Sequence, residues 1–406
     1  MPFRLALSGL NAAQTDLTVT ANNVANVATT GFKGSRAEFA DLFAATQQGV
    51  SSTAIGNGVR VSNVAQQFAQ GNIDFTDNSL DLAISGNGFF AVSDDGALAY
   101  TRSGAFKVDN AGMVVNAKGQ RLQVYPPLAN GGFNTGGLSD LSLTTGVSSP
   151  QATSNVSIVA NLPASATVPA TATFDPADST SYNNTTSLTV YDSLGAAHTA
   201  SMYFVKDGTT PNTWQSHLYV DGNAVGGVQA LTYTATGALQ TPASGNITFG
   251  PYAPATGAAP IDMTFDVGDT TQYGANFTVS ATTQDGFTTG RLIGVDIDSS
   301  GVVQARFTNG RSNPLGQIAM VNFSNPQGLQ QLGDSAWAET FASGQALRGV
   351  AGNSGFGLIQ AGALEASNVD ITEQLVNMIT AQRDFQANAQ MISTADAITQ
   401  TIINIR

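Results

Sequence analysis

The hydrophobic pattern divides this chain into two helical ends and a long middle that reads as β-strands. Over 3–24, apolar or small residues recur at alternating steps of four and three, with Gln14 as the one polar interruption. The same spacing returns over 371–403, where Gln382, Asp396 and Thr399 interrupt it. The first stripe consists of Phe3, Leu7, Leu10, Leu17, Ala21 and Val24, and the second of Ile371, Leu375, Met378, Phe385, Ala389, Ile392 and Ile403. Stripes this narrow are typical of a coiled-coil seam, so we expect terminal α-helices that form a coiled-coil inner domain.

These two ends are too weakly apolar to be stable alone. Ordering the backbone costs about 1–2 kcal/mol for each residue, whereas burial of a large apolar side chain returns roughly 1.5–3 kcal/mol. Isolated helices of this length are marginal in water. We therefore expect the ends to gain their order from partners: from each other, from neighbouring copies of the chain, or from both.

Between the helices the pattern predicts short strands joined by tight turns. Strand patterns are clear over 80–84 and 302–307, and Asp-Gly and Asn-Gly pairs mark turns at 95–96 and 309–310. The short strand spacing of 186–279 suits a β-barrel or sandwich. The expected fold class is mixed α and β, multidomain, with two mainly-β domains nested between the terminal helices. The expected parts are an inner helical domain of 1–29 plus 370–406, connectors 30–70 and 361–369, a discontinuous β domain of 71–147 plus 286–360, and an inserted β domain of 148–285.

Composition narrows the classes of function. The chain has 406 residues and no cysteine, which excludes disulfides, thiolate nucleophiles and cysteine-ligated metals. Only 11% of its residues are charged, and the net charge is −13. An acidic chain without clustered lysine and arginine is unsuited to nucleic acid and to an anionic membrane surface. No apolar run reaches the length of a membrane span, and no signal peptide is visible, so we expect any export to use an uncleaved route.

No set of residues offers credible catalysis or metal binding. His198 and His217 are the only histidines, and they fall on separate predicted strands without Asp or Glu at ligand spacing, so a zinc site is disfavoured. The calcium-like run 296–307 ends in Phe307, where a bidentate glutamate is needed. The G-x-G-x-x-A run at 86–91 precedes strand formers rather than a helix, which argues against nucleotide binding. We expect no enzyme, no cofactor and no metal.

Both ends of the chain and the first β segment carry short motifs. Near the N-terminus they are Ser-Gly-Leu-Asn-Ala-Ala at 8–13, Asn-Asn-Val-Ala-Asn at 22–26 and Thr-Gly-Phe-Lys at 30–33. Later they are Arg-Ser-Gly-Ala-Phe at 102–106 and Gly-Ala-Leu-Glu-Ala-Ser-Asn-Val-Asp at 362–370. Together these motifs resemble those of bacterial flagellar rod and hook proteins. The motif positions of interest are Asn22, Asn23, Asn26, Gly31, Phe32, Leu364, Glu365, Asn368 and Asp370.

The middle of the chain distinguishes members of this family. Rod proteins are much shorter, whereas Val-Tyr-Asp-Ser-Leu-Gly at 190–195 and Leu-Gly-Gln-Ile-Ala at 315–319 resemble hook proteins. That resemblance implies a structural subunit that polymerises into a curved helical tube, a universal joint that transmits torque from rod to filament. It also implies terminal helices around a central channel and an inserted domain at the outer surface. We expect rigid contacts between the inner helices and sliding contacts from the Ser-, Thr- and Asn-rich residues 148–285.

The resemblance further implies partners and a location. The main partner would be the chain itself, as a homopolymer. Other partners would be the distal rod and hook-filament junction proteins, the hook cap, the flagellar type III export apparatus and the length-control protein. The location would be the flagellar hook at the cell exterior, reached without a cleaved signal peptide. Two alternatives stay open: another axial subunit, such as a distal rod or hook-associated protein, and a secreted β-rich adhesin.

The expected assembly interface lies along the terminal helices. Its residues are Phe3, Leu7, Leu10, Leu17, Val24, Leu375, Met378, Phe385, Ile392 and Ile403. Asn22, Asn23 and Asn26 suit either amide hydrogen bonds between stacked helices or a helix end, because Asn competes with its own backbone and tolerates left-handed geometry. We expect Gly31 to be a left-handed helix stop and Phe32 to pack against the connector.

Overall fold

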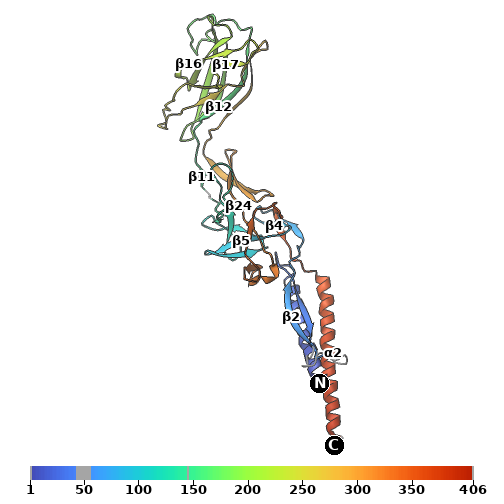
Figure 1. Ribbon diagram of the computed structural model, residues 1–406. Helices are drawn as coiled ribbons and strands as arrows, with labels where there is room; N and C mark the ends of the chain where they lie inside the picture. Colours follow the sequence, from blue (N-terminus) through green and yellow to red (C-terminus); the bar gives the residue numbers. More distant parts are fainter. Residues whose placement is uncertain (1, 43–55, 144–145, 405–406) are drawn as a thin grey trace. The chain divides into compact units, whose positions relative to one another are not determined.

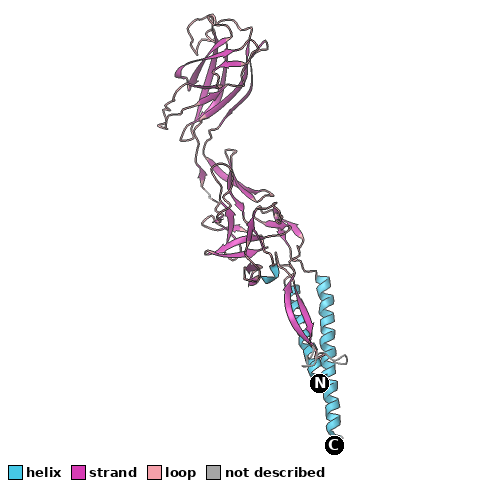
Figure 2. Cartoon of the chain, viewed as in Figure 1, coloured by secondary structure: helices cyan, strands magenta, loops and turns pink. Residues whose placement is uncertain are grey.

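The described chain is mainly β, with one α-helix near each end (Figure 2). The computed structural model describes residues 2–42, 56–143 and 146–404, so part of the expected connector 30–70 and both extreme ends lie outside the described residues. Helix α1 spans Pro2–Ala25 and helix α2 spans Ile371–Asn404. Neither of these helices is long and apolar enough to cross a lipid bilayer.

The chain forms two compact units. Unit 1 comprises Met1–Thr144, Gly294–Arg306 and Ser312–Arg406, and unit 2 comprises Thr145–Ile293 and Phe307–Arg311. Unit 2 therefore interrupts the sequence of unit 1 at two places.

Unit 2 extends further than the expected insert of 148–285, and it includes a turn at 307–311. Asn309 Nδ2 in this turn donates to the carbonyl oxygen of Thr288 at 2.8 Å. The backbone N–H of Thr308 donates to the carbonyl oxygen of Arg291 at 2.9 Å. These bonds attach the turn to the segment 288–291, which also belongs to unit 2.

An antiparallel sheet forms the body of unit 1. In order of pairing it contains β23 (Val302–Phe307), β24 (Ser312–Ile318), β9 (Arg121–Tyr125), β5 (Phe89–Asp94), β6 (Ala97–Thr101), β27 (Ala336–Ala338) and β26 (Gln330–Gly333). Shorter strands join it: β7 (Lys107–Val108), β8 (Val114–Val115), β10 (Ser139–Asp140), β25 (Met320–Asn322) and β28 (Leu347–Gly349). Beside β23 lies β22 (Gly290–Ile297), which also pairs with β11 (Val147–Ser148). A single turn of 3-10 helix spans Pro326–Gly328.

Both faces of this sheet are covered. Phe90 and Val92 of β5 point into one apolar cluster, while Phe89 and Ala91 point into another, because successive side chains of a strand face opposite sides. Leu122 of β9 joins the first cluster and is fully buried. The strands at the centre of unit 1 are therefore buried on both sides, unlike strands that alternate between core and solvent.

Segments from opposite ends of the sequence close unit 1. Strand β3 (Ile73–Phe75) pairs with β30 (Ala363–Glu365), and β4 (Leu82–Ser85) pairs with β29 (Leu358–Ala361), both antiparallel. A separate antiparallel hairpin consists of β1 (Ser35–Asp41) and β2 (Val59–Gln66). The two strand pairs of unit 1 therefore form only when the C-terminal part of the chain packs against the N-terminal part.

Unit 2 is a sandwich of two sheets, one of the two β architectures that the strand spacing predicts. One sheet contains, in order of pairing, β18 (Asn246–Thr248), β19 (Thr264–Asp266), β12 (Asn155–Pro163) and β20 (Thr271–Tyr273), with β21 (Thr278–Gln284) beside β12. The other contains β13 (Asn184–Tyr191), β14 (Ala197–Lys206), β15 (Thr213–Val220), β16 (Asn223–Tyr233) and β17 (Leu239–Thr241). Alternate residues of both sheets, such as Ile158, Leu162 and Phe204, are fully buried in one shared core.

Candidate assembly interface

Helices α1 and α2 lie side by side in unit 1 and run in opposite directions (Figure 1). Near the end of α1, Asn23 Nδ2 donates to Gln374 Oε1, in the first turn of α2, at 3.1 Å. Near the beginning of α1, Gly9 packs so closely against the Asn388 side chain that this side chain would have to shift to admit a Cβ. These two contacts set the antiparallel register of the pair.

Small and polar residues of α1 form its side of the seam between the helices. The positions that recur at steps of three and four, all buried or half-buried, are Ala6, Gly9, Ala13, Asp16, Thr20 and Asn23. The half-buried and buried positions of α2 follow the same spacing at Gln374, Met378, Ala381, Phe385, Asn388, Ile392 and Ala395. Small side chains on one helix let the larger ones of the other approach closely.

The apolar stripe expected on α1 is displaced by one residue from this seam. Phe3 and Leu7 are 52% and 42% exposed, and Leu10, Leu17 and Val24 are half-buried. Because successive residues of a helix are about 100° apart, the stripe faces well away from the line of contact with α2. Within one chain, the stripe on α1 is therefore not the helix-helix seam.

The stripe expected on α2 divides between the seam and the surface. Met378, Phe385 and Ile392 are half-buried on the seam. Leu375 and Ile403 are 46% and 66% exposed. Further exposed apolar residues of α2 are Val376, Ile379, Met391 and Ile398. Large apolar side chains thus remain open on both helices.

Of Asn22, Asn23 and Asn26, Asn23 is the one whose side chain bonds to other elements. Its side chain is buried, accepts a hydrogen bond from Ser35 N at 2.8 Å and donates to Ser35 O at 2.7 Å, in addition to its bond to Gln374. Asn22 and Asn26 bond to each other instead, with Asn26 Nδ2 donating to Asn22 Oδ1 at 2.7 Å. Asn23 therefore fastens α1 to β1 and α2, while its two neighbours act locally at the helix end.

Gly31 has the left-handed backbone expected of it, with φ of +68°, but α1 already ends at Ala25, so Gly31 is not the helix stop. A Cβ at this position would lie 2.5 Å from Ser103 N, so both conformation and space require glycine. Its own N–H donates to the carbonyl oxygen of Glu365 at 2.7 Å. Phe32 is half-buried and lines a pocket of about 380 Å³ with Gln66 and other residues.

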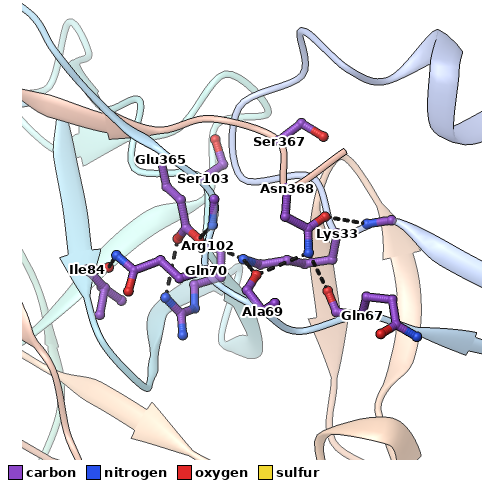
Figure 3. Close-up of polar contacts among 12 residues, drawn as sticks. Lys33, Gln67, Ala69, Gln70, Ile84, Arg102, Ser103, Glu365, Ser367 and Asn368 are labelled. Atoms are coloured by element: carbon purple, nitrogen blue, oxygen red, sulfur yellow. Dashed lines mark hydrogen bonds and ion pairs between the residues drawn. The ribbon is translucent and has the colours of Figure 1, made fainter. Parts of the chain in front are cut away.

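Glu365 is the centre of a buried charge cluster that the sequence did not reveal (Figure 3). Its Oε1 accepts from Lys33 Nζ at 2.6 Å and from Gly71 N at 2.9 Å, and its Oε2 accepts from Arg102 Nη1 at 3.2 Å. The Lys33 and Glu365 side chains have no exposed surface, and that of Arg102 is 5% exposed. Burial lowers the pKa of Lys33, and the Glu365 carboxylate opposes that shift. One carboxylate thus ties together three segments remote in sequence.

The two cationic partners of Glu365, Lys33 and Arg102, lie in motifs of the family resemblance, so those motifs were the signal available in the sequence. Spacing along the chain does not link Lys33 to Arg102, because they meet only through the strand pairing of unit 1.

The remaining motif residues lie in β30 and in the segment that leads into α2. Asn368 Oδ1 accepts from Gly34 N at 2.8 Å, and its Nδ2 donates to the carbonyl oxygen of Gln67 at 2.6 Å (Figure 3). Asp370 caps α2, since its Oδ1 accepts from Thr372 N at 2.7 Å. Leu364 lies in β30 opposite Asp74.

The fold corrects one part of the sequence interpretation, namely that His198 lacks nearby carboxylates. In unit 2 its imidazole lies between Asp192 and Asp221, from two turns that strand pairing brings together. Even so, no group of three or more His, Asp or Glu side chains among the described residues is arranged to hold a metal ion. The calcium-like run begins at Asp296, whose carboxylate pairs with Arg306 at 2.7 Å.

Comparisons with known families cover most of the chain. Residues 3–33 match the flagella basal body rod protein family, and 83–161 match the flagellar hook protein FlgE/F/G D1 domain. Residues 161–287 match the flagellar basal body protein FlaE D2 domain, and 360–405 match the flagellar basal body rod FlgEFG protein C-terminal family. A crystal structure of the Helicobacter pylori flagellar hook protein FlgE2 matches 72% of this chain and 100% of its own, with a TM-score of 0.53 and 13% identity, which is a likeness of fold.

Curated relatives align over the whole length. The flagellar hook protein FlgE of Salmonella typhimurium is 40% identical over 417 residues, covering 100% of both chains. That of Escherichia coli K12 is 40% identical over 418 residues, also covering 100% of both. That of Borreliella burgdorferi is 32% identical and covers 98% of both. This chain therefore belongs to the flagellar hook protein family and is a structural subunit of the hook.

Proposed function

We propose that the chain polymerises through its terminal helices into a curved helical tube, and that this tube is a universal joint transmitting torque from rod to filament. The observation that carries the proposal is the apolar surface that α1 and α2 leave open, of which Phe3, Leu7, Leu375 and Ile403 are examples. Soluble monomers rarely expose large contiguous apolar surface, so such helix faces favour contact with a neighbouring molecule. Full-length similarity to hook proteins favours another copy of this chain as that neighbour.

The energetic argument supports assembly through these helices. Burial of each large apolar side chain is worth roughly 1.5–3 kcal/mol, and such side chains lie exposed on both helices. We infer a coiled-coil inner domain in which the seam within a chain and the stripes between chains are both occupied.

We further propose that the nested organisation separates rigid from sliding contacts. The polar surface of 148–285 would make contacts that slide between subunits, because small polar interfaces permit relative motion more readily than apolar ones. The helices would carry the load. Full-length similarity to hook proteins also disfavours the alternatives of a shorter rod protein and of an adhesin.

The remaining partners and the export route belong to this proposal. They are the distal rod and hook-filament junction proteins, the hook cap, the length-control protein and the type III export apparatus, with delivery to the cell exterior without a cleaved signal peptide. The low content of lysine and arginine supports a role without nucleic acid, since these residues number 15 in all.

A conservative substitution on the open stripe tests the proposal. Leu7→Ala retains helix propensity and removes apolar surface that is 42% exposed in the single chain. We expect the concentration needed for polymerisation to rise about tenfold, because roughly 1.4 kcal/mol of contact energy is lost from each subunit. Sedimentation of polymer and electron microscopy measure the change.

Leu128→Ala is the matched control, since Leu128 is 46% exposed but lies outside the helices. It should polymerise as the unaltered chain does. If Leu7→Ala also polymerised at the original concentration, the α1 stripe would not be the assembly contact.

A further inference from the structure

His198 of β14 lies between two carboxylates in unit 2. Its Nδ1 is 2.6 Å from Asp221 Oδ2, and its Nε2 is 3.3 Å from Asp192 Oδ2. The side chains of His198 and Asp192 are 6% and 0% exposed, so water has little access to the imidazole or to that carboxylate. Asp221 is more open, at 40%.

The imidazole and its two carboxylates lie where three loops meet at one end of the five-stranded sheet β13–β17. Asp192 comes from the turn between β13 and β14, and Asp221 from the turn between β15 and β16. The third loop supplies Thr256, whose Oγ1 donates to Asp192 Oδ2 at 2.8 Å. It also supplies Tyr252, whose hydroxyl donates to Asp221 Oδ2 at 3.3 Å. Among the described residues, the titratable groups that face His198 are Asp192, Asp221 and Tyr252.

The geometry favours a charged imidazole. A neutral histidine carries one N–H, whereas both ring nitrogens of His198 face carboxylate oxygens, so only the imidazolium can donate to both. Neither carboxylate is free to turn away. Asp192 Oδ1 accepts from Leu194 N and Ala196 N, and Asp221 Oδ1 accepts from Thr199 N.

This cluster lies where the chain enters and leaves unit 2. Thr153 N donates to Tyr191 O, and Tyr191 N donates to Thr153 Oγ1, both at 2.9 Å, immediately before Asp192. In the same turn, Gly195 packs against Pro150 and the backbone of Thr289. Loosening the turn would therefore loosen the contacts that hold the entering and leaving strands.

We propose that His198 is a pH-dependent latch, which as an imidazolium links the β13–β14 turn to the β15–β16 turn at this end of unit 2 and breaks that link when rising pH removes its proton. On deprotonation one of the two carboxylates loses its donor on the ring and faces an acceptor nitrogen instead. The two turns then lose their direct link through the imidazole, and both become easier to open.

The direction of the pKa shifts agrees with this geometry. Burial alone would lower the pKa of His198, but its hydrogen bonds to Asp221 and Asp192 outweigh burial and raise the pKa above the ordinary value of 6.5. A raised pKa in the folded state gives stability that is complete below 6.5 and is lost as pH rises through the folded-state pKa. Burial also opposes the charge on Asp192, yet its hydrogen bonds lower its pKa, so the carboxylate stays charged over that range.

The titration of His198 in the full-length chain is the first test. His217 is the only other histidine, and it stacks on Phe174 with ring centroids 4.1 Å apart. The variant His217→Gln, labelled with ¹³C-histidine, therefore gives a single imidazole signal in NMR spectra. We expect it to titrate above 6.5. Titration at or below that value would overturn the latch.

Hydrogen exchange gives a second readout. The amides of Thr199 and Ala196 donate to the two carboxylates. Once corrected for intrinsic exchange, their protection should fall up to about tenfold for each pH unit between about 6.5 and the folded-state pKa of His198. His217→Gln should keep this dependence. Burial lowers the pKa of His217, so deprotonation of His217 makes the folded state more stable as pH rises, not less.

His198→Gln should remove the pH dependence. Equal pH dependence of protection in His198→Gln and in the unaltered chain would contradict the proposal. If His198→Gln fails to fold, the imidazole titration in His217→Gln decides the question alone.

Discussion

At the scale of the residue, the feature with the largest expected effect on stability is a buried carboxylate that forms ion pairs with two cations. Glu365 binds Lys33 and Arg102 where solvent does not reach. Removal of one partner from such a group leaves an uncompensated buried charge, which is far more costly than the pair itself is stabilising. Glu38 offers the contrast, since its bond to Arg36 at 3.1 Å joins side chains that are 41% and 68% exposed.

The same substitution at these two glutamates should have very different effects. We expect Glu365→Gln to reduce the free energy of unfolding of unit 1 by about 3–5 kcal/mol, because Lys33 and Arg102 would lose their counter-charge. Glu38→Gln should cost at most about 1 kcal/mol. Urea unfolding of the full chain measures both, since Trp337 reports on unit 1 and Trp214 on unit 2. Equal effects of the two substitutions would show that the buried cluster does not stabilise unit 1.

At the scale of the element, α1 presents different residues to different partners. Its small and polar residues face α2, and its larger apolar residues stay more open. On a further face, Ser8 Oγ accepts a hydrogen bond from Val59 N of β2 at 3.3 Å. A helix with three such faces explains why one stripe, taken from apolar spacing alone, does not identify the contact with α2.

Neighbouring asparagines on α1 allow a matched test of how the helix is held. Asn23→Ala removes two hydrogen bonds to Ser35 and one to Gln374, and it leaves polar groups without partners. We expect protection of the Ser35 amide from hydrogen exchange to fall roughly ten- to a hundredfold, for a loss of about 1–3 kcal/mol. Asn22→Ala, one residue away, should change it by less than about threefold. A negligible effect of Asn23→Ala would mean that the helix is held by other contacts.

At the scale of the whole molecule, the sequence of unit 1 is interrupted by a unit with its own core. The β3–β30 and β4–β29 pairs close unit 1, while the sandwich core of unit 2 draws only on residues of unit 2. Within unit 2, Gln151 and Phe287 exchange two backbone hydrogen bonds, at 3.0 and 2.9 Å. The ends left by removing 152–286 are therefore neighbours that a short turn can join.

This arrangement makes removal of the sandwich a test of the rigid and sliding contacts. We expect a chain in which an Asn-Gly turn replaces 152–286 to polymerise through its helices, but into a tube that is straighter or of altered stiffness. Electron microscopy gives its curvature and persistence length. Adding Leu7→Ala to the shortened chain should again raise the polymerisation concentration. A shortened chain that cannot polymerise would contradict this division of roles.

Local sequence patterns were sufficient to predict much of the secondary structure and the family. Both terminal helices, the left-handed Gly31 and the strand-rich middle follow from periodicity and turn chemistry, which depend on residues close together in sequence. The motifs at both ends likewise indicated the family that full-length relatives confirm. Helix spacing also located apolar surface on α1 and α2, although it did not identify the small-residue seam where the two helices meet.

The fold was needed for every contact between distant segments. Lys33 reaches Glu365, His198 reaches Asp221, and Asn23 reaches Gln374 only once strands and helices have paired in a particular register. Register depends on the packing of whole faces and on the path of the connections, neither of which leaves a periodic trace at the residues concerned. Periodicity therefore predicted which segments are helices and strands, and three-dimensional pairing set which charged and polar side chains meet.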